Sequence, residues 1–112
     1  MTVSISNINR NLIVKIIGDI DHHTTEELRF KIDKEFKKLN CKNIIFDFSE
    51  VEFMDSSGIG MVIGRYRNIE NAGGIVCVSS ISTDAKRIFD VSGLHKIIKV
   101  YNNIDEALKN IQ

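Results

Sequence analysis

Proline and tryptophan are absent from this chain of 112 residues, and cysteine occurs only twice. Without proline, low-complexity tracts or internal repeats, the sequence contains no recognisable linker, so we expect a single domain over residues 1–112. Cys41 and Cys77 lack metal-ligand spacing, and two reduced thiols are favoured over a disulfide. The three histidines show no coordination pattern, so the sequence predicts neither a bound metal nor a cofactor.

Long apolar runs and an excess of either charge are also missing. No run approaches the ~20 apolar residues that cross a bilayer, and the first residues do not resemble a signal peptide. We therefore expect a cytoplasmic protein with no membrane association. The 15 basic and 15 acidic side chains cancel, whereas nucleic-acid binders usually carry a basic excess, so direct nucleic-acid binding is not indicated.

What the sequence does contain is an alternation of apolar strands and amphipathic helices. Val3–Ile8 and Leu12–Ile17 flank a polar turn and predict an antiparallel hairpin. Strands and helices then alternate, which favours parallel pairing with right-handed crossovers. The later strands are expected at Asn43–Phe48, Ile75–Val78 and Ile97–Tyr101. The prediction is an α/β domain whose mixed, mostly parallel sheet is opened by the N-terminal hairpin and accompanied by about four helices.

Start signals and apolar spacing locate these helices. Thr24 with Glu27 reads as a capping box for the first helix. Its expected buried stripe is Leu28, Ile32, Phe36 and Leu39. The second helix, from about Ser57 to Asn71, has its apolar face at Ile59, Val62, Ile63 and Tyr66. Ser82 begins the third helix, and Asn103 with Glu106 caps the last.

Three segments should meet at the carboxyl edge of the sheet: Asp19–His23, Ser49–Ser56 and Ser79–Ser82. Two stretches around them, 16–28 and 43–64, contain acidic residues but no lysine or arginine. The acidic side chains are Asp19, Asp21, Glu26, Glu27, Asp47, Glu50, Glu52 and Asp55. Such a rim disfavours a bound phosphate and favours a basic partner surface.

Ser56 and Ser57 lie where a strand passes into a helix. As catalytic nucleophiles they would need a base and an oxyanion hole, and the Gly-x-Ser-x-Gly elbow is absent. One of them is expected to cap the helix. Gly58, Gly60 and Gly64 do not match a phosphate loop; they indicate close backbone approach, either to the sheet or to a partner. For Asp21, capping and partner contact both stay open.

With these residues in view, nearly the whole chain resembles the anti-sigma factor antagonists with a STAS domain (sulfate transporter and anti-sigma antagonist), most closely their sporulation branch. The resemblance rests on four motifs. The first two are Gly18-Asp19-Ile20-Asp21-His22-His23-Thr24 and Phe53-Met54-Asp55-Ser56-Ser57-Gly58-Ile59-Gly60. The others are Gly64-Arg65-Tyr66-Arg67 and the segment from Lys86 to Ile98, which includes Ser92-Gly93-Leu94.

The resemblance implies a regulatory switch and not an enzyme. Ser56 would be the phosphorylation site, and the unphosphorylated form would bind an anti-sigma factor and release its sigma factor. That anti-sigma factor would itself be the ATP-dependent serine kinase, and a metal-dependent serine phosphatase would reset the switch. The expected partner-binding residues are Asp21, His22, His23, Thr24, Asp55, Ser56, Ser57, Gly58 and Gly60. Ser57 is expected to help cap the helix, so that Ser57→Ala slows phosphorylation without abolishing it.

Other functions remain as alternatives. An antagonist of the general stress pathway would use the same mechanism with a different anti-sigma factor. A STAS subunit of a transport complex would associate stably with membrane proteins and show no phosphate turnover at Ser56. A hydrolase or nucleotide-binding protein is the weakest alternative, because it would need turnover or nucleotide affinity in the isolated domain.

Overall fold

Five strands form one sheet in the computed structural model, which describes residues 1–111. The strands are β1 (Thr2–Ile8), β2 (Asn11–Ile17), β3 (Asn43–Glu50), β4 (Val76–Ser79) and β5 (Val100–Tyr101). They lie in sequence order across the sheet; β1 and β2 are antiparallel, and every later pair is parallel. The mixed, mostly parallel sheet with its opening hairpin is confirmed.

The hairpin turn follows from its two central residues. Asn9 and Arg10 both have positive φ, 49° and 67°, which is the backbone geometry of a two-residue turn whose twist matches the flanking strands. The turn sets the register of β1 on β2, with Ile8 opposite Asn11. Val3 and Ile5 of β1 therefore pack against the main core while the intervening serines are exposed.

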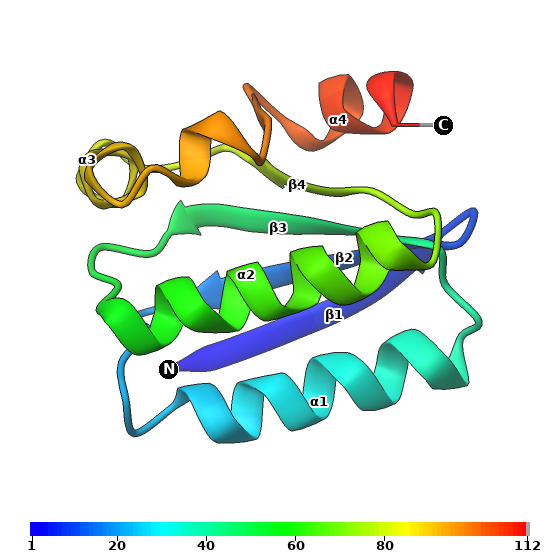
Figure 1. The fold of residues 1–112 in the computed structure, drawn as a ribbon, viewed down its shortest axis with the longest axis horizontal. Helices are drawn as coiled ribbons and strands as arrows, with labels where there is room; N and C mark the ends of the chain where they lie inside the picture. The colour runs from blue at the N-terminus through cyan, green and yellow to red at the C-terminus, as the bar shows by residue number, and fades with distance from the viewer. Residues whose placement is uncertain (112) are drawn as a thin grey trace.

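Within the described residues 1–111, four α-helices cover the sheet. They are α1 (Thr25–Lys38), α2 (Ser56–Asn71), α3 (Thr83–Val91) and α4 (Ile104–Asn110). The main core joins alternate residues of the central strands, such as Val14 and Phe46, to α1, α2 and α3. A smaller cluster joins Ile13, Ile45 and Cys77, on the opposite face, to α4. Figure 1 shows α1 and α2 side by side across the sheet from α4.

The predicted capping box of α1 is wrong. Thr24 has helical φ and ψ, −103° and −21°, and its side chain makes no cap hydrogen bond. Its Oγ1 instead accepts from the Asp21 N–H at 3.1 Å and donates to the Asp21 carbonyl at 3.2 Å. Glu27 forms an i,i+4 ion pair with Lys31. The Thr24 hydroxyl, which the sequence pattern assigned to the helix N-terminus, therefore bonds the backbone of the preceding turn instead.

Two buried stripes also differ from the prediction. In α1, Leu28 and Ile32 are fully buried, but Leu39 lies beyond the helix end and is 37% exposed. In α2 the buried residues are Gly58, Met61, Val62, Arg65 and Ile69. The predicted Ile59, Ile63 and Tyr66 are only partly buried against the core. The buried side of α2 is therefore the side with Gly58, Met61 and Arg65, because Gly58 packs against the loops of the sheet. Apolar spacing alone does not predict this contact.

The last strand is shorter than predicted. Only Val100–Tyr101 pairs with β4, because residues Leu94–Lys96 form a 3₁₀ turn and Ile98 enters the main core. By contrast, Gly93 adopts φ 83° and Leu94 is buried, as the sequence predicts for the end of α3. The amino-terminal half of β4 is therefore left without a neighbouring strand on its outer side.

Gly58 is the point where α2 approaches the sheet loops most tightly. A Cβ placed there would lie 2.5 Å from Cγ of Met54, 2.9 Å from Cγ2 of Ile20 and 3.2 Å from the Ile20 carbonyl oxygen. A Cβ at Gly60 or Gly64 would meet nothing within 4 Å. Close packing onto the fold is therefore confirmed for Gly58, and it does not explain the other two glycines.

We predict opposite effects for alanine at neighbouring glycines of α2. Gly58→Ala should lower the free energy of unfolding by about 1–3 kcal/mol, because the new methyl group overpacks buried Met54 and Ile20. The matched control Gly60→Ala should raise it by about 0.5–1 kcal/mol, because alanine favours the helix and space is open there. Urea unfolding followed by circular dichroism measures both. Equal stability of the two variants would contradict the close approach at Gly58.

Candidate docking face around Ser56

Two loops at the carboxyl edge of the sheet are joined by backbone hydrogen bonds. Ile20 and Met54 form an isolated parallel bridge. The Ile20 N–H donates to the Phe53 carbonyl at 2.9 Å, and the Asp55 N–H donates to the Ile20 carbonyl at 3.1 Å. Segments 19–24 and 51–56 therefore lie side by side, as parallel strand topology predicts.

The Asp55 carboxylate connects both loops to α2. Asp55 is the N-cap residue in extended geometry, and its Oδ1 accepts from the backbone N–H groups of Ser57 at 2.9 Å and Gly58 at 3.1 Å. Its Oδ2 accepts from the His22 N–H at 3.0 Å. The prediction that a serine side chain caps this helix is therefore wrong, because the preceding aspartate supplies the acceptor.

The two adjacent serines have different surroundings. Ser56 is the first residue of α2 and is exposed, whereas Ser57 is half-buried. Ser57 lines a groove of about 330 Å³ between the first turns of α1 and α2, together with His22, Arg29 and Gly60. Ser56 is therefore the more accessible of the two serines.

Asp21 organises the loop before α1. Its Oδ1 accepts from the N–H groups of His23 at 2.9 Å and Thr24 at 3.2 Å. The rings of His22 and His23 are exposed and meet edge to face, with centroids 5.7 Å apart. Asp21 therefore accepts hydrogen bonds within its own loop, which is the local role that the sequence left open. Its half-buried carboxylate lies at the edge of the surface around Ser56.

The third predicted segment, Ser79–Ser82, is bound to the end of β3 and the loop after it through Ser82. Its N–H donates to the Phe48 carbonyl at 3.3 Å, and its hydroxyl donates to the Val51 carbonyl. The same oxygen accepts from the Ala85 N–H at 3.1 Å, which confirms Ser82 as the cap of α3. All three predicted segments therefore converge.

The acidic rim is less uniform than the sequence suggests. Glu50 pairs with Lys15 at 3.2 Å and Glu27 with Lys31 at 3.3 Å, so the packed structure partly neutralises it. Within residues 1–111, no ion pair involves Asp19, Glu26 or Glu52, and all three are exposed. Sequence reasoning missed Arg29, the residue directly after the stretch 16–28 that contains no lysine or arginine. Arg29 supplies positive charge in the groove beside Ser57.

Phe53 is a second residue whose role the sequence did not indicate. Its side chain is 48% exposed although its carbonyl is held by the Ile20 N–H. An apolar residue beside a motif is usually assigned to the core, and here the neighbouring Met54 occupies that place with 1% exposure. A fixed backbone that presents an exposed aromatic ring is typical of an anchor in protein–protein interfaces.

In the described part of the chain, no hydrogen bond joins the hydroxyl of Ser56 or Ser57 to a histidine. Residues 1–111 contain no group of three histidine, cysteine or acidic side chains placed to hold a metal. No helix among them has the length and hydrophobicity needed to span a membrane.

Comparison with known proteins identifies the family. The STAS domain model matches residues 2–107. The anti-sigma F factor antagonist of Paenibacillus polymyxa is 37% identical over 101 residues, which cover 90% of this chain and 86% of that protein. The solved anti-sigma factor antagonist SpoIIAA in its unphosphorylated form aligns with a TM-score of 0.85 and 29% identity over 98% of this chain and 96% of that one.

A second SpoIIAA structure, from Bacillus and in the phosphorylated form, aligns with a TM-score of 0.76 and 28% identity, covering 99% of this chain and 100% of that one. The similarity spans the whole sheet and includes the loops around Ser56, because the family match runs almost from end to end of the chain. The chain therefore belongs to the STAS domain family, among its anti-sigma factor antagonists.

Proposed function

We propose that this protein is a phosphorylation-controlled antagonist that binds an anti-sigma factor while Ser56 is unmodified. The docking face comprises the loop before α1 and the start of α2: Asp21, His22, His23, Thr24, Asp55, Ser56, Ser57, Gly58 and Gly60. The observation that carries the proposal is the exposed Ser56 hydroxyl at the first position of α2, between two loops that Asp55 holds together.

Phosphorylation of Ser56 would block docking without unfolding the domain. A phosphate adds about −1.5 to −2 charges at neutral pH. The N-terminus of α2 stabilises such a group by up to about 1 kcal/mol, so the fold tolerates it. A partner that buries this surface must remove water from the dianion, which is costly unless the partner offers a dedicated cation. The switch is therefore local, through electrostatic and steric blockade.

The proposal includes two enzymes that act on Ser56. The anti-sigma factor is the serine kinase and uses ATP, and a serine phosphatase removes the phosphate again. The antagonist itself performs no catalysis and acts in the cytoplasm. The Asp-His-His motif before α1, the Gly-Arg-Tyr motif within α2 and the Ser-Gly-Leu motif after α3 together favour the sporulation pathway. The similarity to an anti-sigma F factor antagonist supports this assignment. The general stress pathway is the competing assignment, and the identity of the bound anti-sigma factor separates the two.

We predict that substitutions at Ser56 reproduce the two states of the switch. A Ser56→Ala bait should retain a serine-kinase anti-sigma factor from sporulating cells, because the docking face is unchanged. A Ser56→Asp bait should lose most of it, because a charge stands at the centre of the face. Mass spectrometry of the bound proteins names the pathway. Equal recovery on both baits, or transport subunits on both, would contradict the proposal.

A second readout separates local blockade from refolding. Amide chemical shifts of the phosphorylated protein should change around residues 50–65 and in the contacting loop at 20–24. The remote hairpin turn at Asn9 and Arg10 serves as an internal control and should not shift. Broad changes across β1 and α4 would show a global rearrangement and rule out a purely local mechanism.

We predict that Ser56, and not Ser57, accepts the phosphate. Ser56→Ala should abolish transfer by the kinase. Ser57→Ala should keep transfer within about a few-fold of the wild type, because the Ser57 backbone and not its hydroxyl contacts the Asp55 cap. Intact-mass spectrometry after incubation with the kinase and ATP measures both variants. Transfer to Ser56→Ala together with its loss in Ser57→Ala would reverse the assignment.

We predict that Phe53 is an apolar anchor of the docking face. Phe53→Ala should weaken binding to the anti-sigma factor by about 30-fold, the effect of losing a contact of about 2 kcal/mol at an interface centre. Phe30→Ala is the matched control, because Phe30 is 67% exposed on α1 outside the face. Calorimetric titration compares the two. Unchanged affinity of Phe53→Ala would remove this residue from the interface.

A further inference from the structure

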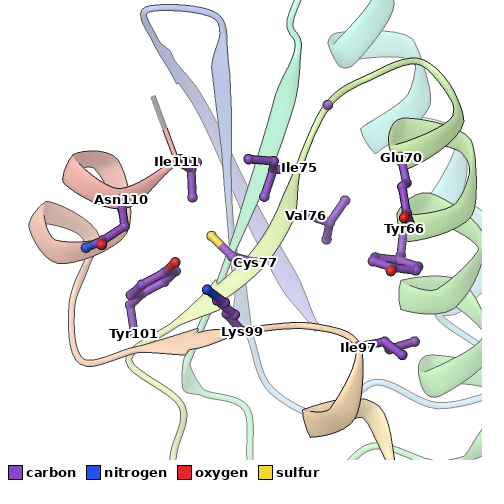
Figure 2. A pocket seen from close by; sticks show the side chains of 11 residues that line it. Tyr66, Glu70, Ile75, Val76, Cys77, Ile97, Lys99, Tyr101, Asn110 and Ile111 are labelled. Atoms are coloured by element: carbon purple, nitrogen blue, oxygen red, sulfur yellow. The ribbon is translucent and has the colours of Figure 1, made fainter.

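A hollow of about 280 Å³ follows the open edge of β4 and shares no residue with the docking face. It exists because β5 pairs only with Val78 and Ser79, which leaves the amino-terminal half of β4 uncovered. Figure 2 shows the hollow between α2, which contributes Tyr66 and Glu70, and the α4 end, which contributes Asn110. Its apolar wall is formed by Ile75, Val76, Cys77, Ile97 and Ile111.

The apolar wall is incompletely covered by the protein itself. Ile75 is 44% exposed and Ile97 is 47% exposed, and they approach the hollow from different segments. Burial raises the pKa of the Cys77 thiol to about 12, so that side chain remains neutral and forms part of the apolar wall. Burying such aliphatic surface is favourable by roughly 25 cal/mol per Å², which gives an apolar ligand a driving force for entry.

The strand edge adds a backbone donor. The Val78 N–H donates to the Lys99 carbonyl, and Val76, two residues earlier, directs its N–H to the same side. In the described chain, no backbone hydrogen bond joins Val76 to residues 97–99. Within residues 1–111, the Val76 N–H therefore has no strand partner on the side of the hollow.

The polar side chains around the hollow differ in their partners. The Glu70 carboxylate raises the pKa of Tyr66, and Figure 2 shows both side chains on the α2 wall of the hollow. Lys99 forms no ion pair within residues 1–111. Burial raises the pKa of the Tyr101 hydroxyl, which also lines the hollow. Lys99 and Tyr101 therefore both offer donors to the hollow.

We propose that this hollow binds a small molecule with an apolar body and a single carboxylate, the carboxylate held by Lys99 and the body by the aliphatic wall. The volume equals that of about nine liquid water molecules and falls at the lower limit of ligand pockets. It accommodates one ring or a short aliphatic chain and excludes a long lipid chain. A carboxylate complements the ammonium group of Lys99, with the Tyr101 hydroxyl as a further donor. The acidic Glu70 lies with Tyr66 on the α2 wall (Figure 2).

Titration of the ¹⁵N-labelled full chain with phenylacetate tests the proposal. Saturable amide shifts are expected at residues 75–77 and 97–101 and at Tyr66, with millimolar affinity. The neutral analogue phenylacetamide should bind about tenfold more weakly, because it lacks the charge that Lys99 recognises. Lys99→Gln should reduce phenylacetate affinity to the level of the amide. Lys96→Gln is the matched control, since Lys96 is exposed nearby but does not line the hollow.

A blocking variant separates binding in the hollow from binding at the surface. Ile97→Trp should fill the hollow and abolish the shifts while the rest of the spectrum stays native, because Ile97 is half exposed and tolerates enlargement. Absence of saturable shifts would overturn the proposal. So would equal affinity for acid and amide, or unchanged affinity in Lys99→Gln and Ile97→Trp. None of these outcomes depends on the anti-sigma factor, so the proposed switch is tested separately.

Discussion

The hydrogen bonds of the Asp55 carboxylate hold together the surface that we propose as the docking face. One oxygen closes the N-terminus of α2 through the N–H groups of Ser57 and Gly58, and the other holds the His22 N–H of the neighbouring loop. A helix N-terminus leaves several backbone donors without partners, and a carboxylate both satisfies them and complements the helix dipole. The same side chain therefore fixes where Ser56 stands and which loop lies beside it.

Gly58 makes this arrangement possible. The start of α2 approaches Ile20 and Met54 so closely that no Cβ fits, and these two residues form the bridge between the loops. A rigid scaffold below an exposed hydroxyl suits the proposed switch, in which a phosphate on Ser56 would change the surface while the packing beneath it stayed intact. Close packing, capping and the exposed serine thus belong to one structural unit at the end of the sheet.

The strands and the helix caps show which features the pattern of apolar and polar residues predicts and which it does not. The central strands β2 and β3 were recognisable because their apolar runs are buried on both faces, and the caps Ser82 and Asn103 because they act locally. The cap assigned to Thr24 failed, since the turn formed by Asp21 competes for the same hydroxyl. The last strand was predicted too long, because Leu94–Lys96 form a 3₁₀ turn and Ile98 is buried in the main core, so that only Val100–Tyr101 pairs with β4.

The sequence by itself determined the α/β class, the order of elements and the meeting of three segments at one edge, because periodicity and right-handed crossovers leave few alternatives. It also singled out the Asp-Ser-Ser-Gly segment. Tertiary structure alone decided which serine is exposed, that Phe53 faces outward, and that Asn43 is buried with hydrogen bonds to the Asn11 side chain and the Ile75 N–H. Exposure and partner choice depend on contacts between residues distant in the chain, and a local pattern carries no information about those contacts.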